Sequence, residues 1–232
     1  MAGSIVLWST TPVPAPSEIV RRLLDQKLIE DGTLRLVVLQ TPLDEPQADE
    51  VGMLRHQFSV EGVKVKAVDP GVQQRQDAVR AEAVDLIRQA HVIIGTGGSP
   101  ERMMSVLQDT PALIAIRDVF ERGGCVGGGS AGAMVFGVGM PGLGDEIVRF
   151  LNWVPLVIAP HFGNYPLDQW KAGFPGETIL GIPDTVVAII ENGVIRSAGQ
   201  VPIEILDTKT GIDQKLSPGG LINLGEAQRG FG

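Results

Sequence analysis

Short apolar runs alternate with longer amphipathic segments over the first half of the chain. The apolar runs predict strands at residues 4–8, 34–40, 63–68, 91–95 and 125–128. The amphipathic segments predict helices at residues 17–29, 45–58 and 76–89, then from Ser99 onward and near 113–122. This alternation is typical of βαβ units. Because runs such as 92–94 are apolar without alternation, they indicate parallel strands that are covered on both faces.

The later part of the chain predicts further strands at residues 156–159, 186–190 and 203–206, with a hairpin turn at Asn192-Gly193. The chain has 232 residues and neither an internal repeat nor a long linker, so we expect a single domain, residues 1–232. The predicted fold is a three-layer α/β sandwich, in which helices cover both faces of a mostly parallel sheet.

The charge and the hydropathy of the chain indicate which classes of partner to exclude. The formal net charge is −8, and lysine and arginine do not cluster, so we expect no nucleic-acid partner. No apolar run approaches the length of a membrane helix, and residues 1–8 lack the regions of a signal peptide. We therefore expect no membrane partner and a cytoplasmic location.

Cysteine and histidine are scarce in this chain. Cys125 is the single cysteine, which excludes an internal disulfide, and we expect it to be buried at the predicted strand 125–128. The three histidines show no spacing that is typical of a zinc site. No metal and no organic cofactor is expected.

A glycine-rich turn follows the predicted strand 125–128. Gly128-Gly129-Ser130-Ala131-Gly132 fits the G-x-S-x-G elbow, in which a strained strand-to-helix turn exposes a serine hydroxyl above a parallel sheet. Small neighbours are needed there because larger side chains would collide with the helix or the substrate. The same kind of turn can also cradle a phosphate or simply pack against a strand, so a nucleophilic Ser130 requires a base and an acid.

Three histidines could supply the base. His56 lies in a polar amphipathic segment and is expected at the surface, and His91 is expected to pack at a strand end. His161 follows the predicted strand 156–159, at the carboxyl end where α/β proteins assemble their sites, so it is the preferred base for Ser130.

Several carboxylates could orient the imidazole, and the residues alone leave them open. They are Asp145, Glu146, Asp168, Glu177 and Asp184. The chain order of α/β-hydrolases would favour Asp145 or Glu146, which lie between serine and histidine. For the oxyanion, the amide of Ala131 is one expected donor, and Gly98 in a second glycine turn is the other.

Four blocks of sequence resemble dipeptidase E, an aspartyl dipeptidase that groups with cyanophycinase among serine peptidases of class I glutamine-amidotransferase-like, or flavodoxin-like, fold. They are residues 92–99, 129–133, 158–164 and 181–184. The resemblance implies Ser130 as nucleophile, His161 as base and an acid that follows the histidine, which falls on Asp184. Substrate contacts are expected in the same blocks, at Ser99, Phe162 and Asn164.

The chain departs from dipeptidase E in three places. In the glycine turn of Gly98 the next residue is Ser99, where the resembling enzymes commonly carry asparagine or aspartate. The chain has Asp184 where the resembling enzymes carry glutamate. Lys171 is the only basic residue between Asn164 and Gly181, whereas the matching segment of those enzymes is longer and rich in arginine and glutamate. We therefore expect a serine peptidase that hydrolyses dipeptides or short peptides, with aspartyl specificity left open. The alternatives are cyanophycinase-like hydrolysis of β-aspartyl dipeptides and a non-catalytic binding protein of this fold. A homodimer is also expected.

Overall fold

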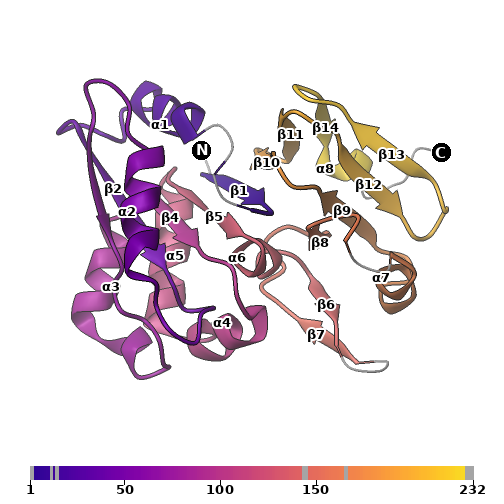
Figure 1. The fold of residues 1–232 in the computed structure, drawn as a ribbon, viewed down its shortest axis with the longest axis horizontal. Coiled ribbons are helices and arrows are strands. Elements are labelled where there is room, and N and C mark those ends of the chain that lie inside the picture. The colour runs from indigo at the N-terminus through magenta and orange to yellow at the C-terminus, as the bar shows by residue number, and fades with distance from the viewer. Residues whose placement is uncertain (1–2, 11–12, 14–15, 143–145, 165–166, 228–232) are drawn as a thin grey trace.

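The computed structural model describes residues 3–227 with the exception of 11–12, 14–15, 143–145 and 165–166 (Figure 1). Its main sheet has eight strands, which are hydrogen-bonded in the order β14-β11-β10-β1-β5-β4-β2-β3. In that order the strands are Leu221–Asn223, Val194–Gly199, Val186–Glu191, Ser4–Trp8, Cys125–Gly129, Val92–Gly95, Thr33–Leu39 and Lys64–Val68. Strands β1, β5, β4, β2 and β3 run parallel, and β10, β11 and β14 extend the sheet in antiparallel pairing.

Helices cover both faces of the parallel half of this sheet (Figure 1). On one face lie α1 (Pro16–Asp25) and α2 (Ala48–Gln57), and on the other α3 (Ala81–Arg88), α4 (Pro100–Leu107) and α5 (Pro111–Glu121). A short 3-10 turn, η1 (Asp77–Val79), precedes α3. The three-layer α/β fold that the pattern predicts is therefore confirmed.

The first strand shows why its sequence is apolar throughout. Val6 belongs to the core beneath α1 and α2, whereas Ile5 and Leu7 belong to the core on the opposite face. A strand with this double burial cannot alternate between apolar and polar residues. The predicted hairpin turn is also present, because Asn192 (φ 49°) and Gly193 (φ 77°) both adopt the positive φ values of a type I′ turn.

A second, four-stranded sheet is the main feature that the hydrophobic pattern does not predict. Its order is β13-β12-β9-β8, formed by Asp213–Leu216, Ile203–Asp207, Thr178–Ile182 and Val157–Pro160. Its apolar residues share a core with β10, so it packs against the face that α3–α5 cover elsewhere. The pattern marks residues 156–159 and 203–206 as strands, but pairing depends on contacts with distant residues that a local pattern does not contain.

The remaining elements surround the junction of the two sheets. They are α6 (Ala131–Met134), the hairpin of β6 (Gly139–Pro141) with β7 (Ile147–Arg149), α7 (Leu167–Gly173) and α8 (Leu224–Ala227). Among the described residues, no helix combines the length and the apolar character that crossing a membrane requires. The single-domain organisation stays a prediction.

Close contact of β1 with β5 makes Gly127 intolerant of a side chain. A Cβ atom at Gly127 would lie 1.9 Å from the carbonyl oxygen of Val6 on the neighbouring strand. We expect Gly127→Ala to lower the free energy of unfolding by about 3 kcal/mol or more, because two central strands would have to separate. Urea denaturation measures this change.

Gly52 provides the matched control. A Cβ atom at this position in α2 would meet no atom within 4 Å. Gly52→Ala is expected to raise the free energy of unfolding by roughly 0.5–1 kcal/mol, because alanine has the better helix propensity. Equal unfolding free energies for the two alanine variants would contradict the packing argument.

Candidate active site

Ser130 lies in a strained turn between β5 and α6. Its backbone has φ 51° and ψ −116°, a conformation that non-glycine residues rarely adopt. A Cβ atom at Gly132 would lie 2.3 Å from the carbonyl oxygen of Gly95, so the helix can approach β4 only because residue 132 is glycine. The elbow thus holds the Ser130 hydroxyl at the carboxyl end of the parallel sheet.

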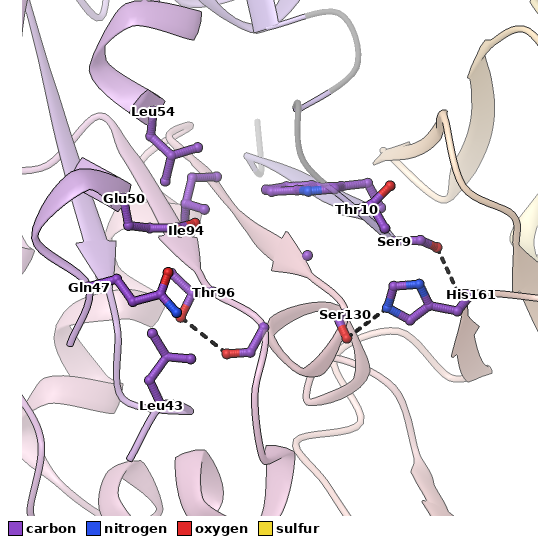
Figure 2. Close-up of a pocket in the computed structure, with 14 residues that line it drawn as sticks. Ser9, Thr10, Leu43, Gln47, Glu50, Leu54, Ile94, Thr96, Ser130 and His161 are labelled. Carbon is purple, nitrogen blue, oxygen red and sulfur yellow. Dashed lines mark hydrogen bonds between the residues drawn. The ribbon is translucent and has the colours of Figure 1, made fainter. Parts of the chain in front are cut away.

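His161 reaches this hydroxyl from the second sheet. It directly follows β8, and its Nε2 lies 3.0 Å from Oγ of Ser130 (Figure 2). Its backbone also has a positive φ of 53°, which turns the chain sharply away from the strand. The structure thus brings the elbow serine and the preferred base into hydrogen-bond distance.

Parallel pairing of β8 with β9 places an acid beside the imidazole. Pro160 pairs with Ile182, so the residues after both strands emerge side by side. Oδ1 of Asp184 lies 3.0 Å from Nδ1 of His161. Because a carboxylate only accepts, Nδ1–H is the donor, and Nε2 is then left to accept the proton of Ser130.

The other four candidate acids have different surroundings. Glu146 is exposed next to β7, Asp168 is exposed in the first turn of α7, and Glu177 is partly buried ahead of β9. Asp145 lies outside the described residues. The geometry therefore favours Asp184, which the resemblance also implies, over the α/β-hydrolase order.

Ser9 is a residue of this site that the sequence reasoning missed. It follows β1, and it is 3% exposed. The backbone N–H of His161 donates to Oγ of Ser9 over 2.8 Å, and the Ser9 hydroxyl donates to the carbonyl of Ile182 over 2.6 Å. Ser9 thereby ties the main sheet to the loop that carries the histidine (Figure 2). Its place at the carboxyl end of a predicted strand was the available signal.

We expect Ser9→Ala to lower kcat by about ten- to hundredfold, because the imidazole loses its backbone anchor. The free energy of unfolding should fall by about 1–3 kcal/mol, since two hydrogen bonds of the buried Ser9 hydroxyl are lost, although the Ile182 carbonyl keeps the N–H of Phe162 as a donor. Steady-state kinetics measures kcat and also KM, which should change little. Urea denaturation measures the free energy of unfolding.

Ser197→Ala is the control for this prediction. Ser197 is also buried, but its hydroxyl has no hydrogen-bond partner among the described residues. Its replacement should leave kcat unchanged. A Ser9→Ala enzyme with the kcat of the parent would show that Ser9 does not position His161.

Two backbone N–H groups are available near Ser130 for an oxyanion. The N–H groups of Gly98 and Ala131 donate to no residue that the structure describes. A Cβ atom at Gly97 would lie 3.6 Å from Cβ of Ser130, which places the second glycine turn beside the elbow. The expected oxyanion role of Gly98 and Ala131 stays a prediction that this geometry permits.

Two cavities adjoin Ser130, of about 240 and 290 Å³. The first lies at the carboxyl ends of β1, β4 and β5. Figure 2 shows Glu50 and Leu54 of α2, and Gln47 just ahead of this helix, on the side opposite Ser130 and His161. The second cavity includes Met134, Met140 and Trp170 in its lining. Cavities of this size suit a small ligand.

The three expected substrate contacts lie outside the linings of both cavities. Ser99 caps α4, since its Oγ accepts from the N–H of Arg102 over 3.1 Å. Phe162 is partly buried, and its ring covers Gly181, where a Cβ atom would lie 2.3 Å from the ring. Asn164 is exposed. Their binding roles stay predictions.

The other reactive side chains lie away from the elbow or are buried. His56 is exposed in the last turn of α2, as predicted, and His91 packs with Arg35 ahead of β4. Cys125 is fully buried in β5, and burial raises the pKa of its thiol to about 11. No group of three or more histidine, cysteine, aspartate or glutamate residues in the described part of the chain could hold a metal ion.

The model of peptidase family S51 matches residues 51–197, a span that includes Ser130, His161 and Asp184. The chain belongs to peptidase family S51. The resemblance to dipeptidase E and cyanophycinase is thereby confirmed at the level of the family.

Curated relatives of this S51 chain include two cyanophycinases. The proteins from Synechococcus elongatus and Thermosynechococcus vestitus are each 27% identical to it over 207 residues. The alignment covers 82% of this chain and 64% of each cyanophycinase. The chain thus spans less than two thirds of the length of these relatives.

Solved structures share the fold of this S51 chain. A peptidase from an acI-B1 actinobacterium superposes with a TM-score of 0.76 at 23% identity, covering 96% of this chain and 97% of its own. A candidate peptidase E from Listeria monocytogenes EGD-e superposes with a TM-score of 0.57 at 16% identity, covering 86% and 99%. At these identities the likeness concerns the fold.

Proposed function

We propose that this S51 chain is a serine peptidase that hydrolyses dipeptides or short peptides through an acyl-enzyme. The observation that carries the proposal is the hydrogen-bonded series from Ser130 through His161 to Asp184, with both donor–acceptor distances at 3.0 Å. Membership of the family supports it. The small cavities that adjoin Ser130 suit short peptides better than folded proteins.

The first half of the reaction forms an ester with Ser130. Nε2 of His161 takes the hydroxyl proton while Oγ attacks the scissile carbonyl carbon. The carbonyl π electrons move onto oxygen, and the N–H groups of Ala131 and Gly98 stabilise the resulting oxyanion. When the C–N bond breaks, His161 gives its proton to the departing amine. Asp184 stabilises the imidazolium that exists between these two transfers.

In the second half of the reaction, water hydrolyses the ester on Ser130. His161 removes a proton from the water molecule as its oxygen attacks the ester carbon, and the proton then returns to Oγ of Ser130 when the C–O bond breaks. The products are an amine and a carboxylate, and the enzyme regains its starting protonation. Each step uses residues that lie at the junction of the two sheets.

A fluorophosphonate probe together with a dipeptide panel tests the proposal. We expect the probe to label Ser130, as seen by peptide mass spectrometry, and the protein to hydrolyse at least some of the dipeptides. A folded protein that neither reacts with the probe nor cleaves any member of the panel would favour a non-catalytic binding protein of this fold.

Cyanophycinase-like hydrolysis of β-aspartyl dipeptides is the second candidate, which the 27% identity to two cyanophycinases favours. Lys171, the basic residue of the segment after Asn164, forms an ion pair with Asp213 over 3.2 Å. Lys171 lies outside the linings of both cavities, so it is not placed to bind the free carboxylate of a β-aspartyl residue there. Including β-aspartyl-arginine and α-aspartyl dipeptides in the panel separates the two candidates.

We also propose a cytoplasmic location and a homodimer, with a peptide substrate and no nucleic-acid partner. The net charge of −8 supports the last point, because it repels a polyanion. Light scattering during gel filtration measures the oligomeric state, and retention on a heparin column measures the affinity for polyanions. A monomer in solution would contradict the proposed homodimer. Retention on heparin at physiological salt would contradict the proposed absence of a nucleic-acid partner.

A further inference from the structure

The first cavity beside Ser130 contains one acidic side chain that the proposed mechanism does not use. Glu50 belongs to α2, and it lines the cavity together with Ser130 and His161. Figure 2 shows its side chain extending from the helix toward Ile94, into the space that Ser130 faces from the other side. The carboxylate therefore borders the space where a bound peptide would lie.

No cation balances this carboxylate among the described residues. Glu50 forms no ion pair with any of them, and neither lysine nor arginine appears in the linings of the two cavities that adjoin Ser130. The other titratable group of the first cavity is His161, which is engaged with Ser130 and Asp184. A ligand that enters this cavity therefore meets one acidic group and neither a lysine nor an arginine.

The surroundings of Glu50 disfavour the ionised form of its carboxyl group. Burial raises the pKa of Glu50, because the ionised carboxylate has lost part of its hydration. A cation placed beside it would replace that lost solvation with a direct electrostatic interaction. An aspartate side chain of a substrate would instead be repelled.

We propose that Glu50 makes the first cavity a subsite for a cationic nitrogen of the substrate. Two sources share this chemistry, the α-ammonium group of a peptide and the side chain of a lysine or arginine residue. The inference rests on the proposed peptidase function and specifies its substrate class. It distinguishes this chain from an enzyme that selects an acidic residue, which would need a basic side chain here.

Calorimetric titration of the Ser130→Ala protein with four peptides tests the subsite without turnover. Lysyl-alanine carries both cations, norleucyl-alanine the α-ammonium group only, N-acetyl-lysyl-alanine the side-chain cation only, and N-acetyl-norleucyl-alanine neither. Adding Glu50→Gln should weaken binding of the cationic peptides by about ten- to hundredfold, the usual effect of a lost charge-assisted hydrogen bond. Binding of N-acetyl-norleucyl-alanine should stay unchanged.

The two peptides with a single cation identify the source. If Glu50→Gln weakens the binding of norleucyl-alanine, the subsite takes the α-ammonium group. If it weakens the binding of N-acetyl-lysyl-alanine, the subsite takes the side-chain cation. Asp49→Asn is the matched control, because Asp49 precedes Glu50 on α2, is exposed and lies outside the cavity. It should bind all four peptides as the parent does.

Folding of the Glu50→Gln protein is followed by thermal denaturation, and Glu50→Asp serves as a second variant that keeps the charge. We expect Glu50→Gln to unfold at the same temperature as the parent or higher, since it removes a desolvated charge. Glu50→Asp should retain part of the preference for cationic peptides.

Equal effects of Glu50→Gln on the cationic and the neutral peptides would overturn the subsite, as would failure of the Ser130→Ala protein to bind any of the four. The proposed function is judged separately, by labelling of Ser130 and by turnover of the wild-type protein. A labelled, active enzyme whose selectivity ignores residue 50 would therefore refute this inference alone.

Discussion

Ser130→Ala is expected to lower kcat/KM for any cleaved peptide by at least about 1,000-fold, with the fold retained. In the proposed mechanism Oγ of Ser130 forms the acyl bond, and alanine has no atom that could replace it. His161→Ala should cause a loss of similar size, because the hydroxyl then has no base at 3.0 Å. Steady-state kinetics on a dipeptide from the panel measures both losses.

Ser105→Ala is the matched control for the first prediction. Ser105 is exposed in α4 and donates its hydroxyl hydrogen bond to the carbonyl of Arg102, away from the elbow. Its replacement should leave activity unchanged. Circular dichroism should show the same helix content in all three variants. A Ser130→Ala protein with near-parent activity would refute the assignment of the nucleophile.

Asp184→Asn is expected to lower kcat by about 100-fold or more, because an asparagine cannot stabilise the imidazolium of His161 by charge. The side chain of Asp184 is 44% exposed, so water screens part of its charge, and the loss should be smaller than for Ser130. Asp184→Glu should keep more activity, because it retains the carboxylate.

Glu146→Gln separates this prediction from the competing choice of acid. If Glu146 oriented the imidazole, its replacement would cause the large loss and Asp184→Asn would not. We expect the opposite result, since Glu146 is exposed near β7 while Asp184 lies 3.0 Å from His161. Activity after each single substitution, measured under the same conditions, decides between them.

Local sequence was sufficient to predict the parts of the site that depend on neighbouring residues. The glycines around Ser130 require a tight turn, and the turn alone orients the hydroxyl. His161 could be singled out because it directly follows an apolar strand, whose carboxyl end is where α/β proteins place functional groups. Burial of Cys125 likewise follows from its position in a strand that is apolar throughout.

Other features depend on pairs of residues that are far apart in the chain. The register of β8 with β9, in which Pro160 pairs with Ile182, places Asp184 beside His161. Ser9 contacts the backbone of His161 across 152 positions of sequence, and a lone serine after a strand gives no sign of that partner. These contacts form where the two sheets meet, and the second sheet was itself absent from the prediction.

The amino-acid sequence by itself determined the α/β architecture, the elbow at Ser130 and the preferred base, because each is encoded by periodicity or by adjacent residues. Only the tertiary structure decided which acid meets the base and that Ser9 anchors it. It also placed Glu50, a residue of an ordinary amphipathic helix, in the lining of a cavity beside Ser130. Those three choices depend on how helices and strands pack, and packing is set by the whole chain rather than by any segment of it.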